Sequence, residues 1–114
     1  MQGRAVTFER YFPEDVPAAR ARYHNETRRL YEVMSTHLKE QKWLAENFSI
    51  ADIANWSWIR SHRRARIPIE GLNHSERWIE QLRQRPACER GQNIPSSPGK
   101  ADAVKSLGSA MTTQ

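Results

Sequence analysis

The sequence predicts an all-α domain, a helical bundle of four to five helices. Apolar side chains recur at helical spacing over residues 23–38, Ser49 and Asp52 mark a helix start, and no stretch alternates apolar and polar residues as a strand does. At 114 residues the chain suits one compact core. We expect a folded domain over residues 1–94 and a disordered tail over residues 95–114, where small and polar residues dominate.

Two helices are expected in the first third of the chain. A short helix over residues 3–12 ends at Pro13, because proline has no backbone N–H to continue it. A long amphipathic helix follows, with Asp15 in its N-cap region and Pro17 in its first turn. Its apolar face consists of Tyr23, Thr27, Leu30, Tyr31, Met34 and Leu38.

The next helix is specified most strongly. Ser49 is a good N-cap, and the carboxylate of Asp52 can accept a hydrogen bond from the cap N–H. Each of these two residues is expected to contribute about 1 kcal/mol to stability. Phe48 precedes the cap and is expected to pack on Ile53 as a hydrophobic staple. Because residues 50–59 are apolar on nearly every side, we expect this helix to lie buried at the centre of the bundle.

A further helix is expected after a loop that contains Gly71. Asn73 followed by Glu76 is a second capping pattern at its start. Pro86 interrupts this helix, and residues 87–92 suit a short helical turn. The apolar residues of the helix are Trp78, Ile79 and Leu82.

The balance of charge is basic. The chain has 18 Lys and Arg against 13 Asp and Glu, a net charge of +5. Five of the basic residues are Arg60, Arg63, Arg64, Arg66 and Arg77. An excess of this kind suits an anionic ligand or nucleic acid, but most such runs are the solvated faces of ordinary domains. We prefer the solvated face.

No residue pattern in the chain indicates a membrane span, a metal site or a catalytic group. No apolar run approaches the roughly 20 residues of a membrane span, and no signal peptide is apparent, so we expect a cytoplasmic protein. Cys88 stands alone and is expected to be a small buried apolar residue. The four histidines have no spacing that suits a metal site or a triad: His24, His37, His62 and His74.

Three blocks of the sequence together resemble glutathione transferases. They are Arg22 to Tyr31 (RYHNETRRLY), Phe48 to Ala54 (FSIADIA), and Trp78 followed by Arg85-Pro86-Ala87. The resemblance covers about residues 1–94 and is strongest to the bacterial nu class and the fungal nitrogen-regulator branch. It implies the helical C-terminal domain of that family, in which the capping box serves folding. For the full-length family it implies homodimers that use glutathione as cosubstrate, for conjugation or for disulfide reduction.

The resemblance also implies ligand contacts. Arg22 is similar to an arginine that extends toward the anionic glutathione in nu-class relatives. From the residues alone, Arg22 could instead be a surface partner of Glu26, four residues along the helix. The segment that begins at Met1 resembles one that borders the pocket for the electrophilic substrate, and Arg4 stands there in place of the usual glutamine. Phe8 either lines the same pocket or belongs to the core.

The sequence departs from the family in two ways. The turn before the capping box is one residue shorter and lacks glycine, so we expect Asn47 to adopt the left-handed conformation. The groups that bind and activate glutathione lie in an N-terminal thioredoxin-like domain, which has no counterpart here. Because Met1 aligns inside a family helix, we expect a truncated gene product that is inactive alone and binds no cofactor.

Two other functions compete with that of a glutathione transferase domain: protein interaction and DNA binding. A non-catalytic protein-interaction domain stays open, because helical domains of this kind also occur in translation and synthetase assemblies. Residues 49–54 resemble the first helix of a helix-turn-helix, but Trp56 and Trp58 occupy positions where the motif needs a tight turn. The sequence therefore argues against DNA binding.

Overall fold

A computed structural model of the protein describes residues 1–94. It contains five α-helices and one short 3-10 helix: α1 (Gln2–Arg10), α2 (Pro17–His37), α3 (Ile50–Ile59), η1 (His62–Ala65), α4 (Asn73–Arg83) and α5 (Pro86–Gln92). No strand occurs in this part of the chain, so the all-α prediction is confirmed. The predicted tail, residues 95–114, lies outside the described residues.

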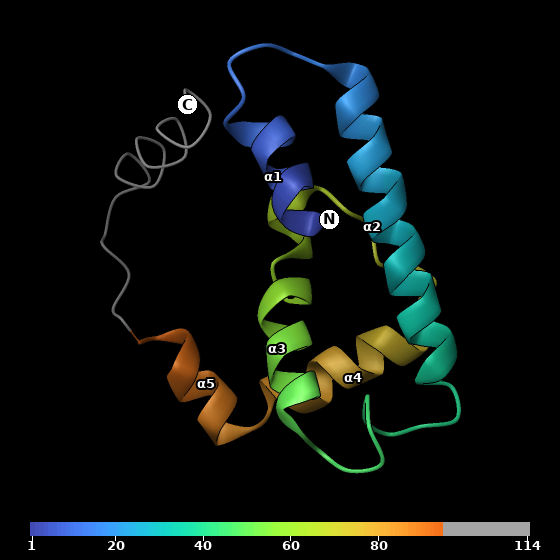
Figure 1. Ribbon diagram of the computed structural model, residues 1–114. Helices are drawn as coiled ribbons and strands as arrows, with labels where there is room; N and C mark the ends of the chain where they lie inside the picture. Colours follow the sequence, from blue (N-terminus) through green and yellow to red (C-terminus); the bar gives the residue numbers. More distant parts are fainter. Residues whose placement is uncertain (95–114) are drawn as a thin grey trace.

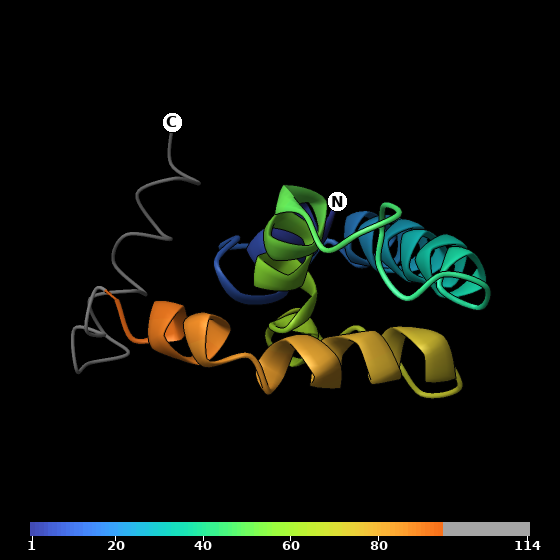
Figure 2. The same cartoon turned by 90° about the horizontal axis from the view of Figure 1, so that it is seen from below.

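The helices form two layers. Helices α1 and α2 lie side by side, and α3 continues below α1 (Figure 1). Helices α4 and α5 follow one another and cross beneath this first layer, where α4 contacts both α2 and α3 (Figure 2). The buried core lies between the layers and includes Trp78 and Leu82 of α4.

Helix α2 begins as predicted at Pro17, but its cap differs from the prediction. The N-cap residue is Val16, and no side chain caps the helix. Asp15 instead accepts a hydrogen bond from Arg20 at 2.8 Å. An aspartate two residues before the helix can meet an arginine side chain more readily than the first backbone N–H groups.

Two arginines connect the end and middle of α2 to other parts of the fold. Arg77 of α4 donates to the carbonyl of Leu38, at the end of α2, over 2.7 Å. Arg28 of α2 donates to the carbonyls of Pro68 and Glu70 over 2.7 and 3.1 Å. Carbonyls at helix ends and in loops need partners when helices pack over them, so these arginines serve the fold.

The capping box of α3 is confirmed, and its aspartate does more than the pattern indicates. Ser49 Oγ accepts from the N–H of Ala51, and the N–H of Ser49 donates to Asp52 Oδ2 at 3.0 Å. The other carboxylate oxygen of Asp52 accepts from the N–H of Leu44 at 3.1 Å and from Nε1 of Trp78 at 2.8 Å. Asp52 is completely buried. One carboxylate thus joins α3, the preceding loop and α4.

The prediction that α3 is buried on nearly every side is wrong. The helix buries one face, which carries Asp52, Trp56 and Ile59. Its other apolar residues are largely exposed: Ile50 by 83%, Ile53 by 48% and Trp58 by 59%. The reason is geometric, because α4 packs against one side of α3 and no described helix covers the opposite side.

The hydrophobic staple of Phe48 on Ile53 stays a prediction. Ile53 is 48% exposed, and Phe48 is half-buried and packs against the core. The ring centroids of Phe48 and Trp43 lie 5.3 Å apart in an edge-to-face arrangement. The guanidinium of Arg85 lies 3.7 Å from the centroid of the Phe48 ring. A cation over an aromatic face is attracted by the ring quadrupole. This contact therefore holds the loop before α3 against the junction of α4 and α5.

The left-handed residue is Arg66, not Asn47. Among residues 1–94, Arg66 is the one non-glycine residue with positive φ, at 53°. It follows η1, and its guanidinium pairs with the buried carboxylate of Glu9 at 2.7 Å. That ion pair between η1 and α1 offsets the cost of a conformation that disfavours a side chain.

Helices α4 and α5 follow the prediction except at the start of α4. Leu72 is the N-cap residue, Asn73 lies inside the first turn, and no side chain caps this helix. The apolar residues Trp78, Ile79 and Leu82 are buried as expected. Helix α5 begins at Pro86 and buries its cysteine, Cys88.

The three hydrogen bonds to Asp52 lead to unequal costs for the two capping residues. We expect Ser49→Ala to cost about 1 kcal/mol, the usual cost of a lost N-cap. Asp52→Ala leaves three donors without a partner and should cost about 3 kcal/mol or more. Urea denaturation of both variants measures the difference. Asn55→Ala, which removes an exposed bond within α3, is the control and should stay near the parent. Equal costs for Ser49→Ala and Asp52→Ala would contradict the role assigned to Asp52.

Candidate functional site

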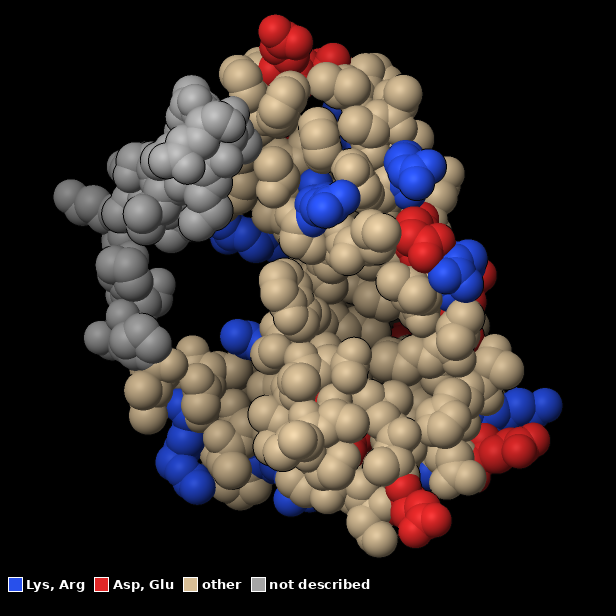
Figure 3. Space-filling model, in the orientation of Figure 1, with Lys and Arg blue, Asp and Glu red and all other residues tan. Residues whose placement is uncertain are grey.

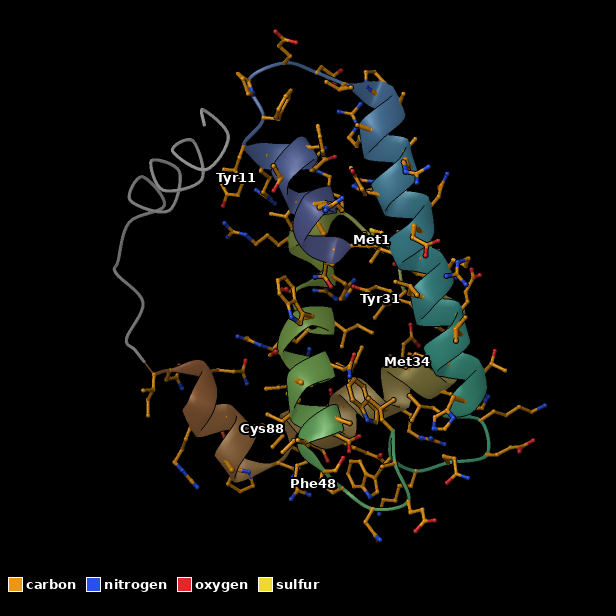
Figure 4. All side chains as sticks on the ribbon, in the orientation of Figure 1. Met1, Tyr11, Tyr31, Met34, Phe48 and Cys88 are labelled. Carbon is orange, nitrogen blue, oxygen red and sulfur yellow. The ribbon has the colours of Figure 1, made fainter. Side chains whose placement is uncertain are left out.

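The described structure contains an apolar cleft between α2 and the joined ends of α1 and α3. Its volume is about 840 Å³. Figure 4 shows Met1, Tyr31 and Met34 along this cleft. The lining comes from α1 (Gln2, Gly3, Arg4) and its N-cap Met1, from α2 (Thr27, Leu30, Tyr31, Val33, Met34, His37), from Leu44, and from α3 (Ala51, Asn55, Trp58, Ile59).

A buried hydrogen-bond network fixes the upper end of the cleft. Tyr31 donates its hydroxyl proton to Gln2 Oε1 at 2.5 Å. The amide nitrogen of Gln2 donates to the Trp58 carbonyl at 2.8 Å and to Ser61 Oγ at 3.1 Å. Burial raises the pKa of Tyr31 above its ordinary value, so the hydroxyl stays a donor. The network joins α1, α2 and the end of α3.

The sequence does not reveal this network. Its pattern places Tyr31 on the apolar face of a helix, and the family resemblance places Gln2 in a segment near the pocket. A tyrosine on a buried face needs a partner for its hydroxyl, and that requirement was the available signal. Nothing in the sequence identified the partner, because Gln2 lies 29 residues away.

The walls of the cleft expose large apolar side chains. Leu30 is 42% exposed, Val33 55% and Trp58 59%. Several such side chains around one hollow mark a ligand site or a partner surface. Arg4 and His37 are the basic side chains of the lining, and no carboxylate belongs to it. The cleft therefore suits an apolar group better than a charged one.

The three predicted pocket residues do not lie together. Met1 and Arg4 line the apolar cleft, and the guanidinium of Arg4 lies 5.8 Å from the Tyr23 ring centroid. Phe8 lies outside the lining and stacks on Tyr23 at 5.4 Å and on Phe12 at 4.9 Å. Phe8 is half-buried and does not belong to the core cluster, and a contact with substrate stays a prediction.

A second hollow, of about 680 Å³, contains the predicted glutathione contact. Arg22 lines it with Met1, Tyr23, Asn25, Glu26 and Arg29. We call it the charged hollow. Because Met1 lines both this hollow and the apolar cleft, the two are neighbours.

The alternative role of Arg22, an ion pair with Glu26, is wrong. Both carboxylate oxygens of Glu26 accept from Arg29, each at 2.8 Å. These hydrogen bonds hold the pKa of Glu26 below its ordinary value, and the charges of Arg29 and Arg22 act in the same direction. Arg22 is exposed, and no carboxylate in the described structure lies within ion-pair distance of it. Its charge is thus available to an anion in the hollow.

The described residues offer binding surfaces rather than reactive groups. No cluster of three or more His, Cys, Asp or Glu in this part of the chain could hold a metal ion. Cys88 is buried, and His62 Nδ1 lies 2.8 Å from the carbonyl of Ile67. None of the helices described here has the length and apolar character to cross a membrane.

Comparison with known proteins agrees with the three sequence blocks. The family model described as "Glutathione S-transferase, C-terminal domain" matches residues 5–86. "Disulfide-bond oxidoreductase YfcG" of Escherichia coli (strain K12) is 41% identical over 88 residues, which is 76% of this chain. "Disulfide-bond oxidoreductase YghU" of the same organism is 29% identical over 100 residues, or 81% of this chain.

A fungal protein is similar as well. "Glutathione S-transferase-like protein gedE" of Aspergillus terreus is 30% identical over 94 residues, or 70% of this chain. The chain spans less than half of each relative, namely 41% of YfcG, 35% of YghU and 42% of gedE.

The buried Tyr31 hydroxyl leads to a pH dependence of stability. The unfolded chain loses this proton near pH 10, the ordinary value for tyrosine, while the folded protein still holds it. The contribution of Tyr31 is therefore complete below about pH 10 and is lost as the pH rises toward the higher folded pKa. Between about pH 9 and 11, the unfolding free energy of the parent should fall more steeply than that of Tyr31→Phe.

Urea denaturation across this pH range measures both slopes. Asn55→Ala, which removes an exposed hydrogen bond and no ionisable group, is the control and should keep the slope of the parent. Identical slopes for the parent and Tyr31→Phe would show that Tyr31 is not buried against Gln2.

Proposed function

We propose that this chain, which belongs to the glutathione S-transferase C-terminal domain family, supplies the substrate-binding helical half of a glutathione-dependent enzyme. The observation that carries the proposal is the apolar cleft beside the charged hollow. The cleft suits the apolar part of an electrophile or of a disulfide. The hollow offers the guanidinium of Arg22, which forms no ion pair within residues 1–94, to a carboxylate of glutathione.

Met1 stands between the two binding surfaces. It lines both hollows, and the neighbouring Gln2 is held by the buried network with Tyr31. A molecule in the cleft and an anion near Arg22 would therefore meet beside the start of α1. Holding two reactants next to each other lowers the entropic part of the barrier between them. Met1 and Arg4 are the proposed contacts for the second substrate.

Disulfide reduction is the favoured reaction, because two of the similar proteins bear the name disulfide-bond oxidoreductase. The glutathione thiolate attacks one sulfur of the disulfide, a new S–S bond forms, and the other sulfur leaves as a thiolate. The described residues of this chain include no donor set that would lower the pKa of the thiol. In the family that role belongs to the thioredoxin-like domain, so we propose that the chain is inactive without it.

A protein-interaction role is the second candidate, and the outer face of α3 favours it. Ile50 and Ile53 are exposed by 83% and 48%, and neither lines the apolar cleft. Exposed apolar residues of this kind are commonly covered by another protein surface. For the enzyme, the covering surface is the thioredoxin-like domain or the second subunit of a homodimer.

We place the protein in the cytoplasm, as is usual for this family.

The direct test joins this chain to the thioredoxin-like domain of YfcG. The chain alone should show no turnover of a small disulfide with glutathione, and the chimera should turn over. Arg22→Gln in the chimera should weaken glutathione binding about tenfold, because a charged hydrogen bond contributes about 1.5 to 3 kcal/mol.

The matched control is Arg83→Gln, since Arg83 is exposed on α4 and pairs with Glu80. It should leave glutathione binding unchanged. Turnover by the chain alone would overturn the proposal that the thioredoxin-like domain supplies the groups that activate glutathione. If Arg22→Gln and Arg83→Gln bind glutathione equally well, Arg22 does not contact the cosubstrate.

A further inference from the structure

Four arginines gather where two helices end. Helix α1 ends at Arg10, Arg60 follows the last residue of α3, and η1 contributes Arg63 and Arg64. The side chain of Arg10 donates to the carbonyl of Arg64 at 2.7 Å, which joins the end of α1 to η1. We call these four residues the arginine cluster. Figure 3 shows basic side chains in separate groups on the left of the molecule, at the levels of α1, α3 and α5 in Figure 1.

Within residues 1–94, no ion pair compensates the positive charge of this cluster. Among residues 1–94, none of its four guanidiniums lies within 4.0 Å of a carboxylate, the distance that defines an ion pair. Their recorded hydrogen-bond partners are neutral: the Arg64 carbonyl, the Tyr11 hydroxyl and the Gln92 side-chain amide. The buried carboxylate nearby, Glu9, is paired with Arg66.

Helix dipoles account for only part of this accumulation. The ends of α1 and α3 each carry roughly half a negative charge, and cations are favoured there. Two helix ends therefore offset roughly one of the four positive charges. Arg60 and Arg63 also line a hollow with Glu76 and Glu80, so the excess of positive charge is greatest at Arg10 and Arg64. Such a surface should attract an anion with several negative charges more strongly than one with a single charge.

Two of the guanidiniums are held in place by aromatic rings. The guanidinium of Arg64 lies 5.9 Å from the Tyr11 centroid, and that of Arg60 lies 5.4 Å from the Trp56 centroid. Tyr11, labelled in Figure 4, lies at the end of α1. Guanidiniums fixed in this way lose less side-chain entropy when they bind phosphate oxygens in the bidentate geometry that arginine favours.

We propose that the arginine cluster binds a small anion that carries two or more linked phosphate groups. Single-stranded nucleic acid fits this surface less well, because bases need open aromatic faces on which to stack. The aromatic rings of the cluster face its own guanidiniums, and Trp56 is only 6% exposed. The site is separate from the apolar cleft and the charged hollow, so it does not depend on the proposed glutathione chemistry.

Calorimetric titration of the 114-residue chain with inorganic triphosphate at low ionic strength tests the proposal. Triphosphate should bind at least about tenfold more tightly than orthophosphate, and the affinity should fall as salt is added. The double variant Arg63→Gln, Arg64→Gln should weaken triphosphate binding about tenfold or more. Arg29→Gln is the matched control, since Glu26 already compensates Arg29, and it should bind triphosphate like the parent.

Two further measurements test whether the Gln double variant loses affinity through lost charge and not through unfolding. Thermal melting should show that the double variant is folded, and Arg63→Lys, Arg64→Lys should retain most of the affinity because it keeps the charge. Triphosphate binding that is equal in the parent and the Gln double variant would overturn the proposal, as would equal affinity for triphosphate and orthophosphate. A single-stranded oligonucleotide that displaces triphosphate at a lower phosphate concentration would overturn it in favour of nucleic acid.

Discussion

The buried carboxylate of Asp52 is the interaction on which the rest of this small fold depends. It accepts hydrogen bonds from the loop at Leu44, from the N-cap at Ser49 and from the indole of Trp78 in α4. A buried carboxylate is tolerable only when its oxygens are satisfied, so the three donors must take fixed positions around it. This requirement sets the direction in which α3 leaves the loop and its contact with α4.

The binding surfaces follow from that placement. With the buried face of α3 fixed against α4, another face of the helix borders the apolar cleft opposite α2, and Trp58 remains exposed there. The network of Gln2 with Tyr31 then positions the start of α1 at the end of the cleft. The same segment borders the charged hollow that contains Arg22. Folding and binding thus use different residues, and the two sets meet in α3 and at the start of α1.

The sequence predicted the parts of this structure that are local. Ser49 and Asp52 are three residues apart, and helix geometry alone brings them together, so the capping box could be recognised. Contacts between distant segments could not be predicted in the same way. The exposure of Ile53 depends on which side α4 packs against, and the Gln2 partner of Tyr31 comes from another helix. From the sequence, Glu26 could pair with Arg22 or with Arg29, because positions i−4 and i+3 are both neighbours on a helix.

The hydrogen exchange of the Trp78 indole N–H, followed by NMR in the native protein, tests the central role of Asp52 most directly. If the bond from Trp78 to Asp52 holds the fold together, this proton should exchange only when the whole domain unfolds. Its opening free energy should then equal the highest values for backbone amides of α4, and equal the unfolding free energy from denaturant titration. Exchange of the indole proton through a local opening of much lower free energy, while the amides of α4 stay protected, would contradict the account.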